Sequence, residues 1–197
     1  MPRQGEKKLG SECEVSAPDE NCRFSLYVLN SLRFWFDSFP TPDIICWNAG
    51  LWDTAILYPE DGCFVSLDQY LENMKKILRE MKKTGAKIIF LTTTPVAEEK
   101  QYLPGPMPPR HRNVDILQYN KAIVQAFQEE DIIVADLFSL MYPNPEQYLR
   151  DDMIHPNEAA MELISSTIAE SIHSIGLFEN PHQKSGSGLK KDEKTIQ

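Results

Sequence analysis

The 197-residue sequence has no apolar run near the roughly 20 residues needed to cross a bilayer, and no apolar signal-peptide core at its start. Basic residues are in the minority, and the net charge is −9. Because polyanions are held chiefly by Lys and Arg, a nucleic-acid partner is not expected. We therefore expect a soluble chain of the cytoplasm that binds neither membranes nor nucleic acids.

Residue spacings typical of metal sites are also absent. The four cysteines contain no C-x-x-C pair, and the four histidines contain no H-x-x-x-H pair. Neither a zinc site nor a cofactor is therefore expected. Without secretory signals the cysteines are expected to be free thiols, and Cys46, inside an apolar run, to be a small buried hydrophobe.

What the chain does contain is an alternation of short apolar runs and helical periodicity. Apolar runs over 43–48, 86–93 and 131–137 predict strands that are buried on both faces in a parallel sheet. Apolar residues at spacings of three and four predict helices over about 22–38, 67–84 and 114–130, and a last helix after residue 155. Residues 1–10 resemble the end of a helix, and a weak alternation over 11–17 indicates a further short strand.

This order of elements predicts an α/β domain whose parallel sheet is covered by helices on both faces. We expect one domain over 1–178 and a disordered polar tail over 179–197. The loop over 95–113 holds five prolines, and a loop of this length is usually a lid or a binding loop. Ligands bind at the carboxyl ends of such strands, where Asn48, Thr92 to Thr94 and Asp136 stand.

Asp152 and His155 stand three residues apart directly before the last helix. A histidine that acts as a general base needs one free ring nitrogen and an acceptor that fixes its tautomer, which Asp152 can supply across a tight turn. Alternatively the acidic residues and Asn157 only favour a helix start, with Pro156 at the first helical position. The position of the pair at the ligand-binding edge of the sheet favours the functional interpretation.

The stretch Trp47-Asn48-Ala49-Gly50-Leu51-Trp52-Asp53, followed much later by Asp152-Met153-Ile154-His155, resembles the SGNH hydrolases, also called GDSL esterases and lipases. The resemblance covers about residues 6–178 and implies a three-layer α/β/α fold with a flavodoxin-like parallel sheet. It also implies an acyl or acetyl ester substrate. In that family's roles, Asn48 would bind the oxyanion, His155 would be the general base and Asp152 would orient it.

The family's first block, a buried strand that ends in Gly-Asp-Ser, has no counterpart here. The serines nearest the start, Ser11 and Ser16, fall in the stretch that matches the family's second strand, so neither is expected to be the nucleophile. In the family's strand order 2-1-3-4-5, the missing strand would lie between 11–17 and 43–48. We therefore expect 11–17 to be poorly ordered or to pair directly with 43–48.

Smaller departures concern the oxyanion-binding groups and the function. No glycine lies between Gly10 and Gly50, so the backbone N–H of Asn21 or Cys22 would have to replace that of the family's second-block glycine. Cys46 and Ala49 stand where the family commonly has glycine and aspartate. The resemblance thus implies an SGNH-type ester hydrolase whose nucleophilic serine is absent from this chain. The alternative is a non-catalytic SGNH-like module that binds a glycan or an acylated ligand.

Overall fold

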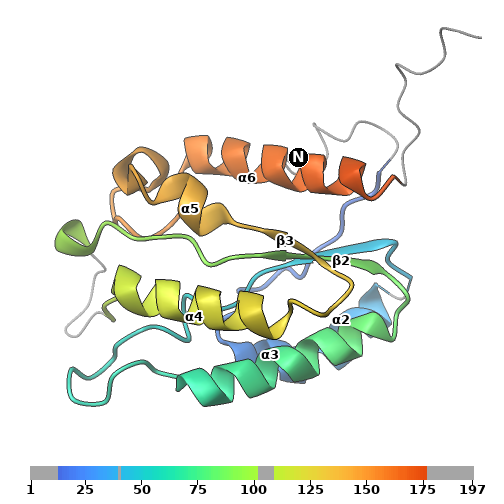
Figure 1. Ribbon diagram of the computed structural model, residues 1–197, viewed down its shortest axis with the longest axis horizontal. Helices are drawn as coiled ribbons and strands as arrows, with labels where there is room; N and C mark the ends of the chain where they lie inside the picture. Colours follow the sequence, from blue (N-terminus) through green and yellow to red (C-terminus); the bar gives the residue numbers. More distant parts are fainter. Residues whose placement is uncertain (1–12, 40, 102–108, 177–197) are drawn as a thin grey trace, which may run out of the picture.

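The computed structural model describes residues 13–39, 41–101 and 109–176, in which helices surround a parallel sheet (Figure 1). Over these residues the sheet has three strands in the order β1-β2-β3. Trp47 of β1 is aligned with Phe90 of β2, and Leu91 of β2 with Ala135 of β3. The elements in chain order are α2 (Ser25–Ser38), β1 (Ile44–Trp47), α3 (Leu67–Lys82), β2 (Lys87–Leu91), η2 (Glu98–Lys100), α4 (Asn113–Ala126), β3 (Ile133–Ala135), α5 (Leu137–Met141), η3 (Pro145–Tyr148) and α6 (Glu158–Ser174).

The alternation of side chains along β2 divides the core into two layers. Ile88 and Phe90 pack with α2, α3 and α4, whereas Ile89 and Leu91 pack under α6. Figure 1 shows α6 on one side of the sheet and the other three long helices on the opposite side. The predicted α/β fold with helices on both faces is confirmed.

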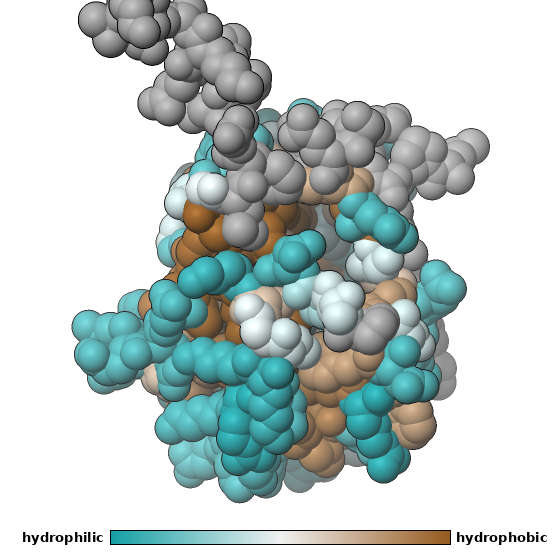
Figure 2. Space-filling model, turned by 90° about the vertical axis from the view of Figure 1, so that its right-hand side faces the viewer, coloured by the Kyte–Doolittle hydropathy of each residue, from teal (hydrophilic) through white to brown (hydrophobic). Residues whose placement is uncertain are grey.

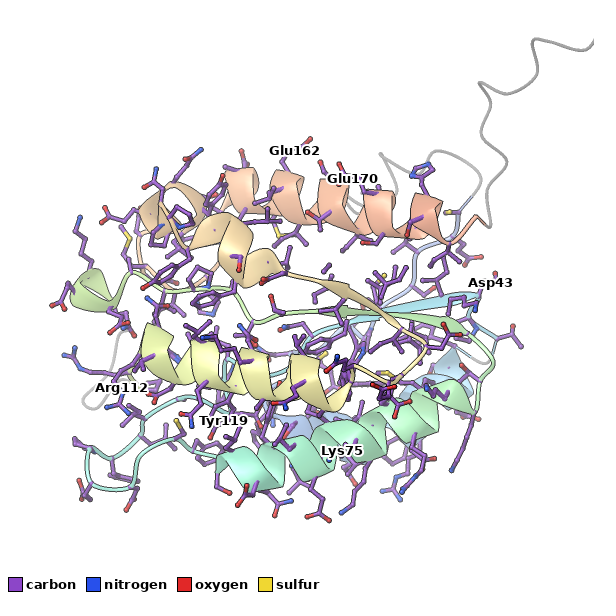
Figure 3. The ribbon with its side chains drawn as sticks, in the orientation of Figure 1. Asp43, Lys75, Arg112, Tyr119, Glu162 and Glu170 are labelled. Atoms are coloured by element: carbon purple, nitrogen blue, oxygen red, sulfur yellow. The ribbon has the colours of Figure 1, made fainter. Side chains whose placement is uncertain are left out.

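Helix α3 shows why the periodic segments fold as the sequence predicts. Ser66 caps it by accepting a hydrogen bond from the Gln69 backbone N–H. One face of the helix is buried, and the ring of Tyr70 on this face packs at a tilted angle against that of Tyr119, with 5.1 Å between the ring centroids; Tyr119 lies between α4 and α3 (Figure 3). Packing of this kind, more than intrinsic propensity, stabilises helices in domains.

Two expectations about the first strands are wrong. Residues 13–17 form no strand, contrary to the weak alternation over 11–17; of the two alternatives expected for 11–17, direct pairing with 43–48 is not found for residues 13–17, and poor order stays a prediction. Strand β1 is not buried on both faces: Ile44 and Ile45 are half-buried and Cys46 is exposed. Cys46 lies on the same face as Ile44, and α6 packs mainly against β3.

Other expectations lie outside the described residues, namely those for 1–10, for Ser11 and for the tail over 179–197. Of the proline-rich loop, only 95–101 and 109–113 are described, and they contain the short helix η2. None of the helices that the structure describes is both long and apolar enough to traverse a lipid bilayer.

Candidate active site

The loops that follow the three strands gather at the carboxyl edge of the sheet, at the left of Figure 1. Asn48 follows β1, and its side-chain N–H donates to the carbonyl oxygen of Leu91 at the end of β2 (2.7 Å). Thr92 follows β2, and its hydroxyl lies 3.1 Å from a carboxylate oxygen of Asp136, which follows β3. The sequence prediction that these residues share one edge is confirmed. Figure 2 looks onto the opposite end of the molecule, where hydrophilic residues cover much of the lower surface.

Asp152 and His155 form the pair that their spacing predicts. The Asp152 Oδ2 atom lies 2.7 Å from His155 Nδ1, while Oδ1 accepts the backbone N–H groups of Ile154 (2.9 Å) and His155 (2.8 Å). A carboxylate in contact with Nδ1 favours the tautomer in which Nδ1 carries the proton and Nε2 is free to accept one. The His155 side chain is 48% exposed, so a reactant can reach it.

The turn that creates this pair has a strained residue at its centre. Met153 has φ of 59°, in the left-handed region that non-glycine residues rarely adopt. The turn is fixed by two backbone bonds of 2.8 Å, from Arg150 N–H to the His155 carbonyl and from Met153 N–H to the Arg150 carbonyl. Ile154, which is 1% exposed, anchors the loop in the core.

The start of α6 differs from the expectation. Pro156 is not the first helical residue: it pairs with Leu149 in an isolated antiparallel bridge. Asn157 is the N-cap, and its side chain accepts the Ala160 N–H at 3.0 Å and donates to the carbonyls of Gln147 and Leu149. The cap therefore also holds the loop that carries His155, so the helix start and the Asp-His pair belong to one structure.

The pKa of Asp152 reflects the same contacts. Partial burial raises it, but the backbone N–H groups of His155 and Ile154 and the His155 ring together lower it below the ordinary value of 3.8. Asp152 is therefore a carboxylate at neutral pH, as a group that orients a histidine must be.

Asn48 stands on a loop that is fixed at several points. The Tyr70 hydroxyl donates to the Ala49 carbonyl (2.8 Å). Gly50, with φ of 151°, approaches Thr93 so closely that a Cβ atom there would lie 2.3 Å from the threonine hydroxyl. A donor that stabilises a developing oxyanion has to be held in place before the reaction, and this loop meets that requirement.

Asp53 ties the same loop to the start of α2. Its fully buried carboxylate accepts the Ser25 backbone N–H at 3.1 and 3.0 Å and the Ser25 hydroxyl at 2.5 Å. Asn73 of α3 in turn donates to the Ser25 hydroxyl at 3.0 Å. Burial raises the pKa of Asp53, and the Ser25 donors partly offset this effect. Sequence reasoning assigned no role to Asp53, because its charge alone does not reveal a buried partner.

Two side-chain amides of α4 hold the chain that leaves β2. Asn120 bonds both backbone groups of Thr93 at 2.9 Å, and Asn113 bonds those of Val96 at 2.9 and 2.8 Å. Slightly further on, Ala97 N–H donates to the Met153 carbonyl (3.1 Å), which joins this segment to the Asp152–His155 loop. The strand-end loops therefore form one connected, hydrogen-bonded edge.

Within the ranges that the structure describes, no hydrogen bond joins a serine hydroxyl to the His155 ring, whose bond is to Asp152. Ser25 is fully buried and bonded to Asp53, so it is not available as a nucleophile. Ser16 is exposed on the segment that precedes α2.

His111 is a residue of this edge that the sequence did not single out. It is 5% exposed, and its Nδ1 atom is buried without a hydrogen-bond partner. Burial, with a smaller contribution from the charge of His155, lowers the pKa of His111 to about 4. A histidine in a proline-rich loop carries no sequence signal of burial, so only the structure reveals it.

Comparison with known proteins identifies the family. The sequence model of the GDSL-like lipase/acylhydrolase family matches residues 33–163. The chain belongs to this family. The match includes Asn48, Asp152 and His155, the residues on which the resemblance to SGNH hydrolases rests. A search of curated proteins found no match.

Several solved structures share the fold. A member of the lipolytic G-D-S-L family from Veillonella parvula aligns with a TM-score of 0.64 and 13% identity, over 86% of this chain and 85% of its own. A carbohydrate esterase of family 3 from Talaromyces cellulolyticus aligns with a TM-score of 0.60 and 18% identity, over 84% of this chain and 77% of its own. A lipase/acylhydrolase from Enterococcus faecalis aligns with a TM-score of 0.60 and 18% identity, over 77% of this chain and 71% of its own.

Proposed function

We propose that this GDSL-family chain provides the base, the orienting acid and the oxyanion donor of an SGNH-type ester hydrolase that acts on acyl or acetyl esters. His155 is the general base, Asp152 orients it and Asn48 donates to the oxyanion. The observation that carries the proposal is the 2.7 Å contact between Asp152 Oδ2 and His155 Nδ1 at the carboxyl edge of the sheet.

The chemistry of these groups suits acyl transfer. With its Nδ1 proton held by Asp152, His155 can take the proton of an attacking hydroxyl on Nε2 and later return it to the leaving alcohol. One Nδ2 proton of Asn48 is used by the Leu91 carbonyl, which fixes the amide plane and leaves the second proton for a substrate oxygen. The proposal leaves the nucleophile unassigned, because no Gly-Asp-Ser occurs in the sequence.

Hydrolysis of p-nitrophenyl acetate tests this proposal, measured on this chain and on a version extended by the residues encoded upstream. His155→Ala in each version is the control for background hydrolysis. Activity that requires His155 in the extended version supports the proposal and places the nucleophile upstream. Absence of His155-dependent hydrolysis in both versions refutes it.

A second candidate is a non-catalytic module that holds a glycan or an acylated ligand at the same edge. The observation that favours it is the Asp152–His155 pair without a serine hydrogen bonded to it in the described ranges. The carbohydrate esterase of family 3 and an acetyl xylan esterase among the similar structures make acetylated sugars a reasonable first ligand to test. Ligand binding that survives in His155→Ala, without hydrolysis in either version, would favour this function.

A further inference from the structure

His111 is a buried histidine with an unused nitrogen at the edge where the ester would bind. Buried polar atoms almost always have a hydrogen-bond partner, and leaving one without a partner costs about 1–3 kcal/mol. The Nδ1 atom of His111 is one of three buried side-chain polar atoms without a partner among the described residues; the other two are Trp47 Nε1 and Thr93 Oγ1. His111 lies near enough to His155 for the charge of that ring to affect its pKa.

Hydrogen bonds hold the backbone of His111, whereas its ring atom Nδ1 has none. The Gln101 side chain accepts the His111 N–H (2.8 Å) and donates to the His111 carbonyl (2.6 Å). The preceding residue, Arg110, exchanges two backbone bonds with Ile56, of 2.8 and 3.0 Å. Arg112, which follows and is labelled in Figure 3, pairs with Asp115 and is the N-cap of α4. These contacts fix where the ring is, while no hydrogen bond of the described residues fixes how it is turned.

The ring is neutral across the physiological range, because burial and the neighbouring His155 disfavour its protonation. A neutral imidazole has one donor and one acceptor nitrogen, so it matches a group that can both donate and accept. A hydroxyl is such a group, whereas a carboxylate can only accept and would use the donor nitrogen alone. Rotation about the Cβ–Cγ bond changes the side to which Nδ1 points without breaking a hydrogen bond.

We propose that His111 is a specificity-determining residue that binds a hydroxyl group of the substrate's alcohol, so that the site favours esters of polyhydroxylated alcohols over plain alkyl esters. The inference rests on the proposed ester-binding function. The placement supports it: Ala97 N–H donates to the Met153 carbonyl, and this bond joins the loop of His111 to the turn that carries His155.

Two small esters of nearly equal shape test the proposal: 2-hydroxyethyl acetate, and propyl acetate, in which a methyl group replaces the hydroxyl. The extended version is expected to prefer the hydroxyl-bearing ester in kcat/KM. His111→Phe should reduce that preference by about 10- to 100-fold, through loss of one hydrogen bond and of its buried partner. His111→Gln, which keeps hydrogen-bonding atoms, should retain part of it. His173→Phe makes the same chemical change at an exposed position near the end of α6 and should leave the preference unchanged.

A binding measurement keeps the outcome independent of hydrolysis. In the unmodified chain, the ring signals of His111 in a ¹H–¹³C NMR spectrum should shift on titration with 2-hydroxyethyl acetate and not with propyl acetate. If neither ester is hydrolysed, the proposed function fails while this titration still decides the role of His111. Equal shifts with both esters, no shift with either, or equal loss of both activities in His111→Phe and His111→Gln would overturn the proposal. If His111→Phe does not fold, as judged by its thermal melt, His111→Gln and the titration decide.

Discussion

Replacement of Asp152 by asparagine changes the proton position on His155 and little else. The Asn Oδ1 atom can still accept the backbone N–H groups of Ile154 and His155, so the turn keeps its two bonds of 2.9 and 2.8 Å. At the third contact the carboxylate oxygen becomes an NH₂ group, which donates to His155 Nδ1. The ring then carries its proton on Nε2, the nitrogen that a general base needs free.

The expected size of the effect follows from these contacts. The equivalent change in serine proteases lowers kcat about 10⁴-fold, and we expect about 10³- to 10⁴-fold here. The two backbone bonds change from charged to neutral acceptors, a loss of about 1 kcal/mol each. A quarter of the Asp152 side chain is exposed, and screening reduces the sum to about 1 kcal/mol, or about 2–4 °C in Tm.

The stability difference should depend on pH in a defined direction. The pKa of Asp152 is lowered in the folded chain, so its carboxylate stabilises the fold above pH 3.8, and this contribution is lost as the pH falls below that value. The gap in unfolding free energy between the wild type and Asp152→Asn should therefore narrow between pH 5 and pH 2. Denaturant unfolding of both proteins at each pH measures this gap.

The ¹⁵N chemical shifts of the His155 ring report its tautomer. Activity is measured as hydrolysis of p-nitrophenyl acetate by whichever version, this chain or the extended one, is active. Asp151→Asn, a neighbouring and exposed carboxylate, is the matched control and should change neither. If Asp152→Asn keeps the Nδ1–H tautomer, or loses less than about tenfold in kcat, the assigned role of Asp152 is wrong.

Three further substitutions test the loop after β1. Asn48→Ala should lower kcat about 10²- to 10³-fold with a small change in KM, as expected for loss of one oxyanion donor; an equal fall of binding and turnover would contradict that role. Gly50→Ala should destabilise the chain by about 1–3 kcal/mol in denaturant unfolding, because its Cβ would lie 2.3 Å from the Thr93 hydroxyl, and Thr93→Ala in the same chain should recover part of the loss. Asp53→Ala leaves the Ser25 N–H and hydroxyl without their acceptor and should cost about 2–4 kcal/mol, or about 4–16 °C in Tm by circular dichroism; an unchanged melt would show that the buried network adds no stability.

Much of the fold follows from local patterns. The apolar run over 86–93 contains strand β2, whose residues after Lys87 are all buried, and the apolar residues after Ser66, at spacings of three and four, form helix α3. Both predictions succeed because burial on two faces and helical periodicity leave direct traces in the sequence. The same reasoning fails for Cys46, because the exposure of a strand depends on which helix covers it, and that helix is remote in the chain.

The candidate site divides in the same way. Asp152 and His155 lie three residues apart, so a single turn brings them together and the spacing alone indicates the contact. Asn48 could be placed at the same edge because parallel strands align their carboxyl ends. Its partner, the Leu91 carbonyl, is 43 residues away and is known only from the structure.

The sequence by itself therefore determined the three strands and the four long helices, the Asp-His pair and the edge of the sheet at which it lies. Only the tertiary structure decided which polar groups are enclosed: that Asp53 holds the start of α2, that Asn113 and Asn120 hold the segment after β2, and that His111 is buried near His155. The physical reason is the range of the interactions. Periodicity and short spacings are local properties of the chain, whereas burial and the pairing of buried polar groups depend on residues that folding brings together from distant parts of it.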